Sequence, residues 1–163
     1  NEQNEVYNSK EANRQQDPAS RPRLKNISQR VVIANRFFRK GSRRKTLFVS
    51  LHADNSPNRP KGPLVIFLNR KGKVDTRSRT FARVMQKALY DDETNIPAQI
   101  SGRSLAVLRG NQAFAEILVE IRNVDDKGDD KGDAWALRFH NERQKDANRI
   151  VKGFLDYVEG RSR

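Results

Sequence analysis

Two polar residues that can take part in hydrolysis, His52 and Glu120, stand at the ends of largely apolar segments. His52 follows the apolar run at residues 46–51 and opens the next loop, where an imidazole can bind a metal ion. Glu120 ends the segment 115–120, and burying its carboxylate in a strand is costly without a partner. On position alone two structural alternatives stay open. The histidine could be hydrogen-bonded at a strand end, and the glutamate could form a salt bridge with an arginine or lysine.

The other candidates for chemistry are excluded or are expected on the surface. The sequence has no cysteine, which excludes disulfides, cysteine-ligated metal sites and a thiol nucleophile. The second histidine, His140, lies near the C-terminal helix between Phe139 and Asn141, and we expect it on the surface. Glu116 is expected to face solvent.

Apolar periodicity predicts the elements that must position these groups. Segments 46–51 and 64–68 are nearly continuous in apolar residues, as is typical of strands buried on both faces of a parallel sheet. Residues 77–90 predict an amphipathic helix. We expect an α/β fold with a mostly parallel central sheet flanked by helices, and sites at the carboxyl ends of its strands. The other expected elements are a helix capped by Ser28, strands at 105–108 and 117–121, and a C-terminal helix ending at Gly160 with Ala147, Ile150, Val151, Phe154 and Val158 on one face.

Length and composition suit a single domain, which we place at residues 1–163. Residues 8–26, interrupted by Pro18 and Pro22, predict a long polar loop, and residues 125–133 predict an acidic surface loop. No apolar run approaches the ~20 residues of a membrane span, and the polar opening is unlike a signal peptide. That abrupt opening suggests a domain that is incomplete at its N-terminus.

The chain is strongly basic, with 33 Lys and Arg against 20 Asp and Glu and a formal net charge of +13. Such a surface attracts nucleic acid, anionic lipid headgroups or acidic cell-wall polymers, and charge alone does not choose among them. No base-reading motif or aromatic platform accompanies the densest basic cluster, which disfavours nucleic acid and favours a solvated basic face. The cluster comprises Arg36, Arg39, Lys40, Arg43, Arg44 and Lys45.

Two motifs carry a resemblance to a known family. The sequence Ser-Leu-His-Ala-Asp at residues 50–54 and Leu-Val-Glu at residues 118–120 resemble motifs of the bacterial N-acetylmuramoyl-L-alanine amidases of the AmiA, AmiB and AmiC type. The resemblance extends from about residue 6 to residue 160, with the motifs in the family's order. Further matching positions are Arg14, Asp17, Leu24, Arg30, Ala34, Asn35, residues 105–109, Ala147, Ile150, Gly153 and Tyr157.

The resemblance implies a zinc enzyme that cleaves the amide between N-acetylmuramic acid and L-alanine in peptidoglycan. It gives His52 as a zinc ligand and Glu120 as the catalytic general base. Asp54 is expected to orient His52 without binding the metal itself. It places the protein in the periplasm or outside the cell, and it admits an activator protein as a partner. The oligomeric state is left open.

The departures from the family pattern define an alternative. The family's first strand, with a Gly-His-Gly-Gly motif, and the following helix with a glutamate ligand have no counterpart here, so two expected zinc ligands are missing. After Glu120 the sequence reads Ile121-Arg122-Asn123, where the family usually has Thr-Gly-Phe. The alternative is a degenerate or truncated amidase domain that serves as a cell-wall-binding or regulatory module.

Overall fold

The computed structural model describes residues 27–39, 46–56, 61–90, 96–124 and 132–160. The polar loop expected at 8–26 lies outside the described residues, as does most of the acidic loop expected at 125–133. Asp133 is described, and the surface position expected for it is wrong. Its exposed fraction is only 2%, and it begins the short helix α5 (Asp133–Ala136).

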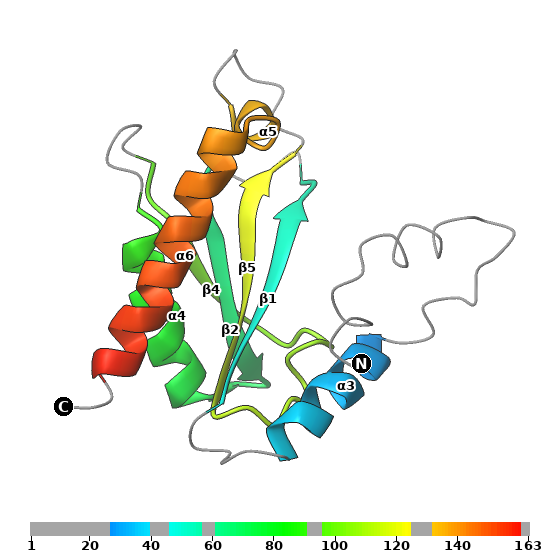
Figure 1. Cartoon of the computed structure of the whole chain (residues 1–163). Helices are drawn as coiled ribbons and strands as arrows, with labels where there is room; N and C mark the ends of the chain where they lie inside the picture. The colour runs from blue at the N-terminus through cyan, green and yellow to red at the C-terminus, as the bar shows by residue number, and fades with distance from the viewer. Residues whose placement is uncertain (1–26, 40–45, 57–60, 91–95, 125–131, 161–163) are drawn as a thin grey trace, which may run out of the picture.

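The described strands form one mixed sheet of five. β1 (Leu47–Asp54) pairs in parallel with β5 (Ala115–Asn123), and β2 (Leu64–Arg70) pairs in parallel with β4 (Gln99–Arg103). β2 runs antiparallel to β5 and to the short β3 (Lys73–Val74). In Figure 1 the arrowheads of β1 and β5 lie together near α5, and β2 points the opposite way. The expected α/β class is confirmed, and the sheet is mostly but not entirely parallel.

Two helices cover one face of this sheet (Figure 1). α4 (Thr76–Ala88) is capped by Asp75, whose carboxylate accepts hydrogen bonds from the backbone N–H groups of Arg77 and Ser78. α6 (His140–Gly160) packs across α4. Between helices and sheet lies the larger core, whose buried members are Val65, Phe67, Phe81, Ala82, Met85, Leu89, Ala98, Ala115, Ile117, Val119 and Tyr157.

A smaller apolar core lies on the opposite face of the sheet. Alternate residues of β2 and β5 point there and pack with the turn that follows β4. α3 (Ile27–Arg39) is tied to this turn by Asn35, whose amide donates to the carbonyl of Gly110 at 2.9 Å and accepts from the N–H of Gln112 at 2.8 Å. The buried members of this core are Leu64, Ile66, Val107, Leu108 and Leu118.

Two predictions about the strands are wrong. Residues 105–108 form a turn, in which the N–H groups of Leu108 and Arg109 donate to the carbonyl of Leu105. The strand β4 at 99–103 was not expected. β1 is not buried on both faces, since Leu51 is 53% exposed and the only strand that pairs with β1 among the described residues is β5.

Two details of the helices also differ from expectation. α3 begins at Ile27, so Ser28 lies inside its first turn and does not precede the helix. α6 ends at Gly160 as expected, but its buried positions are Asp146, Gly153 and Tyr157. Of the apolar side chains expected on one face of this helix, Val151, Phe154 and Val158 are exposed.

Candidate functional site

His52 and Glu120 lie directly opposite one another on neighbouring parallel strands. In the register of β1 with β5, His52 pairs with Glu120, and Ser50 pairs with Leu118. Residues paired in this way point to the same face, and their strands are about 4.8 Å apart. The sheet therefore brings together an imidazole and a carboxylate that are 68 positions apart in the sequence. Both residues are half-buried.

Both residues lie inside their strands, which continue further than expected. β1 continues past His52 to Asp54, and β5 continues past Glu120 to Asn123. The sequence predicted His52 in the loop after its strand and Glu120 at the strand end. Because the backbone at both positions is held by the sheet, the two side chains project from a rigid surface.

Ser50 contacts the imidazole of His52 and was not predicted to do so. The hydroxyl oxygen of Ser50 lies 2.9 Å from Nε2 of His52. This contact orients the ring and leaves Nδ1 as the nitrogen that can meet a metal ion or substrate. The signal was present in the sequence, because residues two apart in a strand share a face.

Glu120 is flanked on its other side by an apolar strand. It pairs with Leu64 of β2 in the antiparallel register, so His52 and Leu64 lie on either side of it. One carboxylate oxygen of Glu120 is buried. A carboxylate that is partly shielded from water in this way suits proton transfer better than a freely solvated one.

Asp54 lies two residues beyond His52 in β1. Its carboxylate accepts a hydrogen bond from the N–H of Asn55 at 2.8 Å, and its carbonyl accepts from the N–H of Val124 at 2.7 Å. Its expected part in orienting His52 stays a prediction.

The described residues do not complete a catalytic zinc site. Such a site usually has three protein ligands, and no group of three or more histidine, aspartate or glutamate side chains able to hold a metal occurs in the described part of the chain. His140 lies exposed at the start of α6, as expected. Among the residues the structure describes, His52 is therefore the only imidazole at the site.

Glu116 is buried, and the prediction that it faces solvent is wrong. Its exposed fraction is 4%, and it pairs with Phe48 in the same register that pairs Glu120 with His52. Burial raises the pKa of Glu116 to about 8, and the charge of Asp75 adds to the rise. Two residues four apart in a strand share a face, so Glu116 lies on the face of Glu120 but at the other end of β5.

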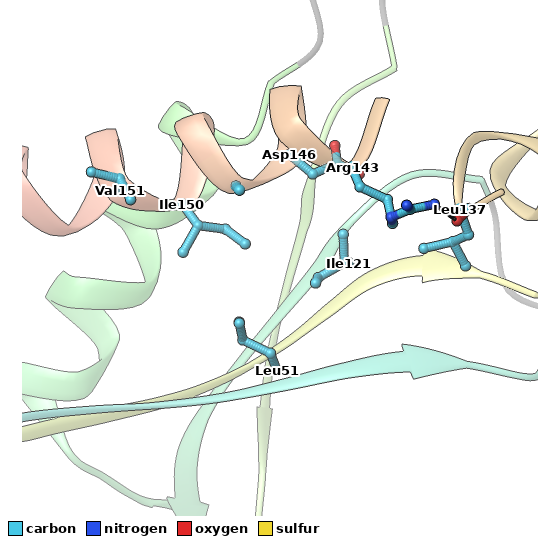
Figure 2. Close-up of a pocket in the computed structure, with 8 residues that line it drawn as sticks. Leu51, Ile121, Leu137, Arg143, Asp146, Ile150 and Val151 are labelled. Carbon is cyan, nitrogen blue, oxygen red and sulfur yellow. Dashed lines mark hydrogen bonds between the residues drawn. The ribbon is translucent and has the colours of Figure 1, made fainter. Parts of the chain in front are cut away.

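An open apolar groove lies on the opposite face of β1 and β5. It has a volume of about 320 Å³ and is lined mainly by apolar side chains, with Leu51 and Ile121 as its floor and Ile150 and Val151 of α6 as its wall (Figure 2). Because Leu51 and His52 point to opposite faces of β1, the sheet separates this groove from His52 and Glu120.

The comparison with known families decides what the chain is related to. Residues 3–157 match the family model of N-acetylmuramoyl-L-alanine amidases. The chain belongs to this amidase family. The resemblance expected from the motifs at 50–54 and 118–120 is thereby confirmed. Among curated proteins none matches the sequence significantly.

Solved amidase structures share the fold. Ami1 from Mycobacterium abscessus is 27% identical, with a TM-score of 0.65 over 81% of this chain and 61% of Ami1. AmiC2 of Nostoc punctiforme is 25% identical, with a TM-score of 0.62 over 82% of this chain and 66% of AmiC2. The CwlD amidase from Clostridioides difficile, in complex with the GerS lipoprotein, is 15% identical over 88% of this chain and 69% of CwlD, and its TM-score of 0.65 shows likeness of fold alone. The chain spans about three fifths of the length of Ami1.

Proposed function

We propose that this protein is a peptidoglycan hydrolase that cleaves the amide between N-acetylmuramic acid and L-alanine. The observation that carries the proposal is the pairing of His52 with Glu120 on neighbouring strands of an amidase-family fold. Membership of the family supports the substrate class, as do Ami1 and AmiC2, which are both named as amidases.

Glu120 acts as the general base and then as the general acid in this proposal. Its carboxylate accepts a proton from water as the oxygen bonds to the amide carbonyl carbon. The same carboxyl group then donates the proton to the amide nitrogen as the carbon–nitrogen bond breaks. The products are a free carboxylate on the lactyl group of muramic acid and a free α-amine on L-alanine.

Zinc belongs to the proposal through the family resemblance, which gives His52 as one ligand. The described residues supply that one imidazole, and they do not fit a site of three protein ligands. Metal chemistry therefore forms no step of the mechanism above. Asp54 is proposed to support His52 from the same strand.

The proposed surroundings follow from the substrate. Peptidoglycan lies in the cell envelope, so the protein acts in the periplasm or outside the cell. Among the described residues, no helix is long and apolar enough to cross a membrane. An activator protein is a further proposed partner, which the family resemblance admits.

A second candidate function is a wall-binding or regulatory module without hydrolysis. The observation that favours it is the single imidazole found at the site among the described residues. The zinc content of the purified chain separates the two functions, because one histidine offers too few ligands for tight binding. Stoichiometric zinc contradicts the module, and zinc far below one equivalent contradicts a zinc-dependent amidase.

The direct test of the general base is Glu120→Gln, assayed for turnover of purified peptidoglycan. We expect a loss of about 10²- to 10⁴-fold, because glutamine keeps the shape and cannot accept the proton. Glu116→Gln is the matched control, since it makes the same change on the same face of β5 and should leave turnover within about 2-fold. Equal turnover by the Glu120→Gln variant and the native protein would remove Glu120 from the mechanism.

A further inference from the structure

A buried ionic cluster lies directly beyond Glu120, at the end of β5. Arg122 donates to both carboxylate oxygens of Asp146 on α6, at 2.9 and 2.8 Å, and contacts Asp133 at 3.4 Å. The three side chains are 8% exposed or less. A buried charge is stable only when it is paired and hydrogen-bonded, and here two elements outside the sheet supply the partners.

The arginine of this cluster keeps its charge. Burial lowers the pKa of Arg122, but the hydrogen bonds and negative charges of Asp146 and Asp133 outweigh burial and raise it. Arg122 therefore carries its positive charge inside the cluster. Its position coincides with the point where the sequence departs from the family pattern.

The cluster accompanies a bulge that immediately follows the two candidate catalytic positions. His52 pairs with Glu120, but the next paired residues are Asp54 and Asn123, so β5 contains one residue more than β1 over this interval. Ile121 lines the groove beside α6, and Arg122 binds the same helix through Asp146. Figure 2 shows Ile121 pointing toward the helix that carries Asp146. Two consecutive side chains directed to one side are what a β-bulge produces.

The residues around the bulge also hold the segment that follows His52. Asn123 exchanges two hydrogen bonds with the backbone of Ser56: its amide donates to the carbonyl at 2.7 Å and accepts from the N–H at 3.2 Å. Asp133 accepts at 2.9 Å from the N–H groups of both Asn123 and Gly62. The chain leaving β1 is therefore fastened at Ser56 and again at Gly62.

We infer that Asn123 and Asp133 are positioning residues for the catalytic pair. They hold the bulge after Glu120 and the segment after His52 in one arrangement. In this way they fix the position of the His52 imidazole relative to the Glu120 carboxylate. The inference rests on the proposed amidase function for its kinetic consequence. Its geometric consequence, the orientation of the His52 ring, does not depend on that function.

The test compares Asn123→Ala and Asp133→Asn with the native protein by NMR and by kinetics. Asp133→Asn keeps an acceptor for the two N–H groups and replaces the oxygen that faces Arg122 with a donor. We expect faster amide hydrogen exchange at Ser56 and Gly62, a shifted His52 ring signal, and a kcat on peptidoglycan lowered about 10- to 100-fold with KM changed less than about 3-fold. The chain has only two histidines, so exposed His140 is an internal reference whose signal should not move.

Asn148→Ala is the matched control for Asn123→Ala, because Asn148 is an exposed asparagine of α6 that contacts Gln144. It should change none of these measurements. If Asp133→Asn fails to fold, Asn123→Ala still tests the positioning role, since it leaves the ionic cluster of Arg122, Asp133 and Asp146 intact. Faster exchange at Ser56 and Gly62 with an unmoved His52 signal overturns the inference, because it shows a structural clamp alone. If the native protein shows no activity on peptidoglycan, the proposed function is contradicted. The NMR measurements then test the positioning role separately, because they do not depend on activity.

Discussion

At the scale of single residues, the hydroxyl of Ser50 contacts one nitrogen of the His52 imidazole and leaves the other nitrogen, Nδ1, available. It contacts Nε2 of His52 from the same strand, two residues away. A histidine without this contact can rotate about its side-chain bonds and present either nitrogen. The candidate site therefore includes a third residue, which holds the imidazole in place.

Replacing Ser50 with alanine should lower kcat on peptidoglycan by about 10- to 100-fold, because the ring loses its support. Ser50→Thr keeps the hydroxyl and should restore most of the rate. Steady-state kinetics on both variants measures this. Equal losses in the two variants would show that the volume at position 50 matters and the hydrogen bond does not.

Glu116 predicts a dependence of stability on pH. The folded state holds its proton up to about pH 8, whereas an ordinary glutamate releases it near 4.5. Between these values the folded state binds more protons than the unfolded state, so the free energy of unfolding falls as pH rises through the window. Glu116→Gln removes this titration. Its stability relative to the native protein should grow by on the order of 4 kcal/mol from about pH 5 to about pH 9.

Chemical denaturation of both proteins across this pH range measures the difference. All groups other than Glu116 are common to both proteins, so their contributions cancel in the comparison. A difference that stays constant with pH would mean that Glu116 is ionised in the folded state at neutral pH.

At the scale of elements, the contact between α4 and α6 holds the helical layer together. Gly153 of α6 lies against α4, where an added Cβ would come within 2.8 Å of the sulfur of Met85 and 3.0 Å of Cβ of Ala88. Helix propensity would favour alanine at this position. The close approach of the two helices explains why glycine is present instead.

Gly153→Ala should therefore destabilise the protein by about 1–3 kcal/mol, since overpacking outweighs the gain in helix propensity. Gly160→Ala is the control in the same helix, because nothing lies within 4 Å of its added Cβ. It should be neutral within about 0.5 kcal/mol. Thermal unfolding of the two variants checks this, and equal stabilities would show that α6 shifts to accept the methyl group.

Much of this framework could be predicted from the sequence, because long periodic segments identify themselves. The strand at 64–68 and the helix at 77–90 are examples. β4 was missed because its sequence, Gln-Ile-Ser-Gly-Arg, has a single apolar residue, and the nearby apolar run at 105–108 misled in its place. Short apolar segments in turns and in strands have similar compositions. Only pairing with a neighbouring strand in the folded protein distinguishes them.

The sequence proposed the members of the candidate site, whose roles stay predictions, and it could not give their geometry. The motifs indicated His52 and Glu120, but their direct pairing depends on the register of two strands that are far apart in the chain. The burial of Asp133 was hidden for a similar reason, since its partner Arg122 belongs to another element. The side of the sheet on which Glu116 lies could have been predicted from strand alternation, which puts residues 116 and 120 on one face.

At the scale of the whole molecule, the net charge of +13 would favour association with the cell wall, the proposed site of action. Peptidoglycan carries carboxylates, and a strongly basic protein is drawn to such a polymer through long-range attraction. Salt screens this attraction, with a Debye length that shrinks from about 10 Å at 0.1 M to about 3 Å at 1 M.

Sedimentation with purified peptidoglycan should show binding that falls by at least about 10-fold between roughly 0.05 M and 0.5 M salt. The same titration with duplex nucleic acid is the comparison for a generic basic surface. Binding to peptidoglycan that does not change with salt would assign recognition to specific contacts rather than to charge.

The proposed activity of the site formed by His52 and Glu120 is the cleavage of one particular amide bond. Mass spectrometry of peptidoglycan digested by the protein tests it most directly, because each kind of wall hydrolase leaves a different pair of ends. Digestion should yield glycan chains with a free lactyl carboxylate and stem peptides with a free amino-terminal L-alanine, and both should be absent after treatment with the Glu120→Gln variant. Intact muramyl–alanine linkages, or cleavage within the glycan or the peptide, would contradict it.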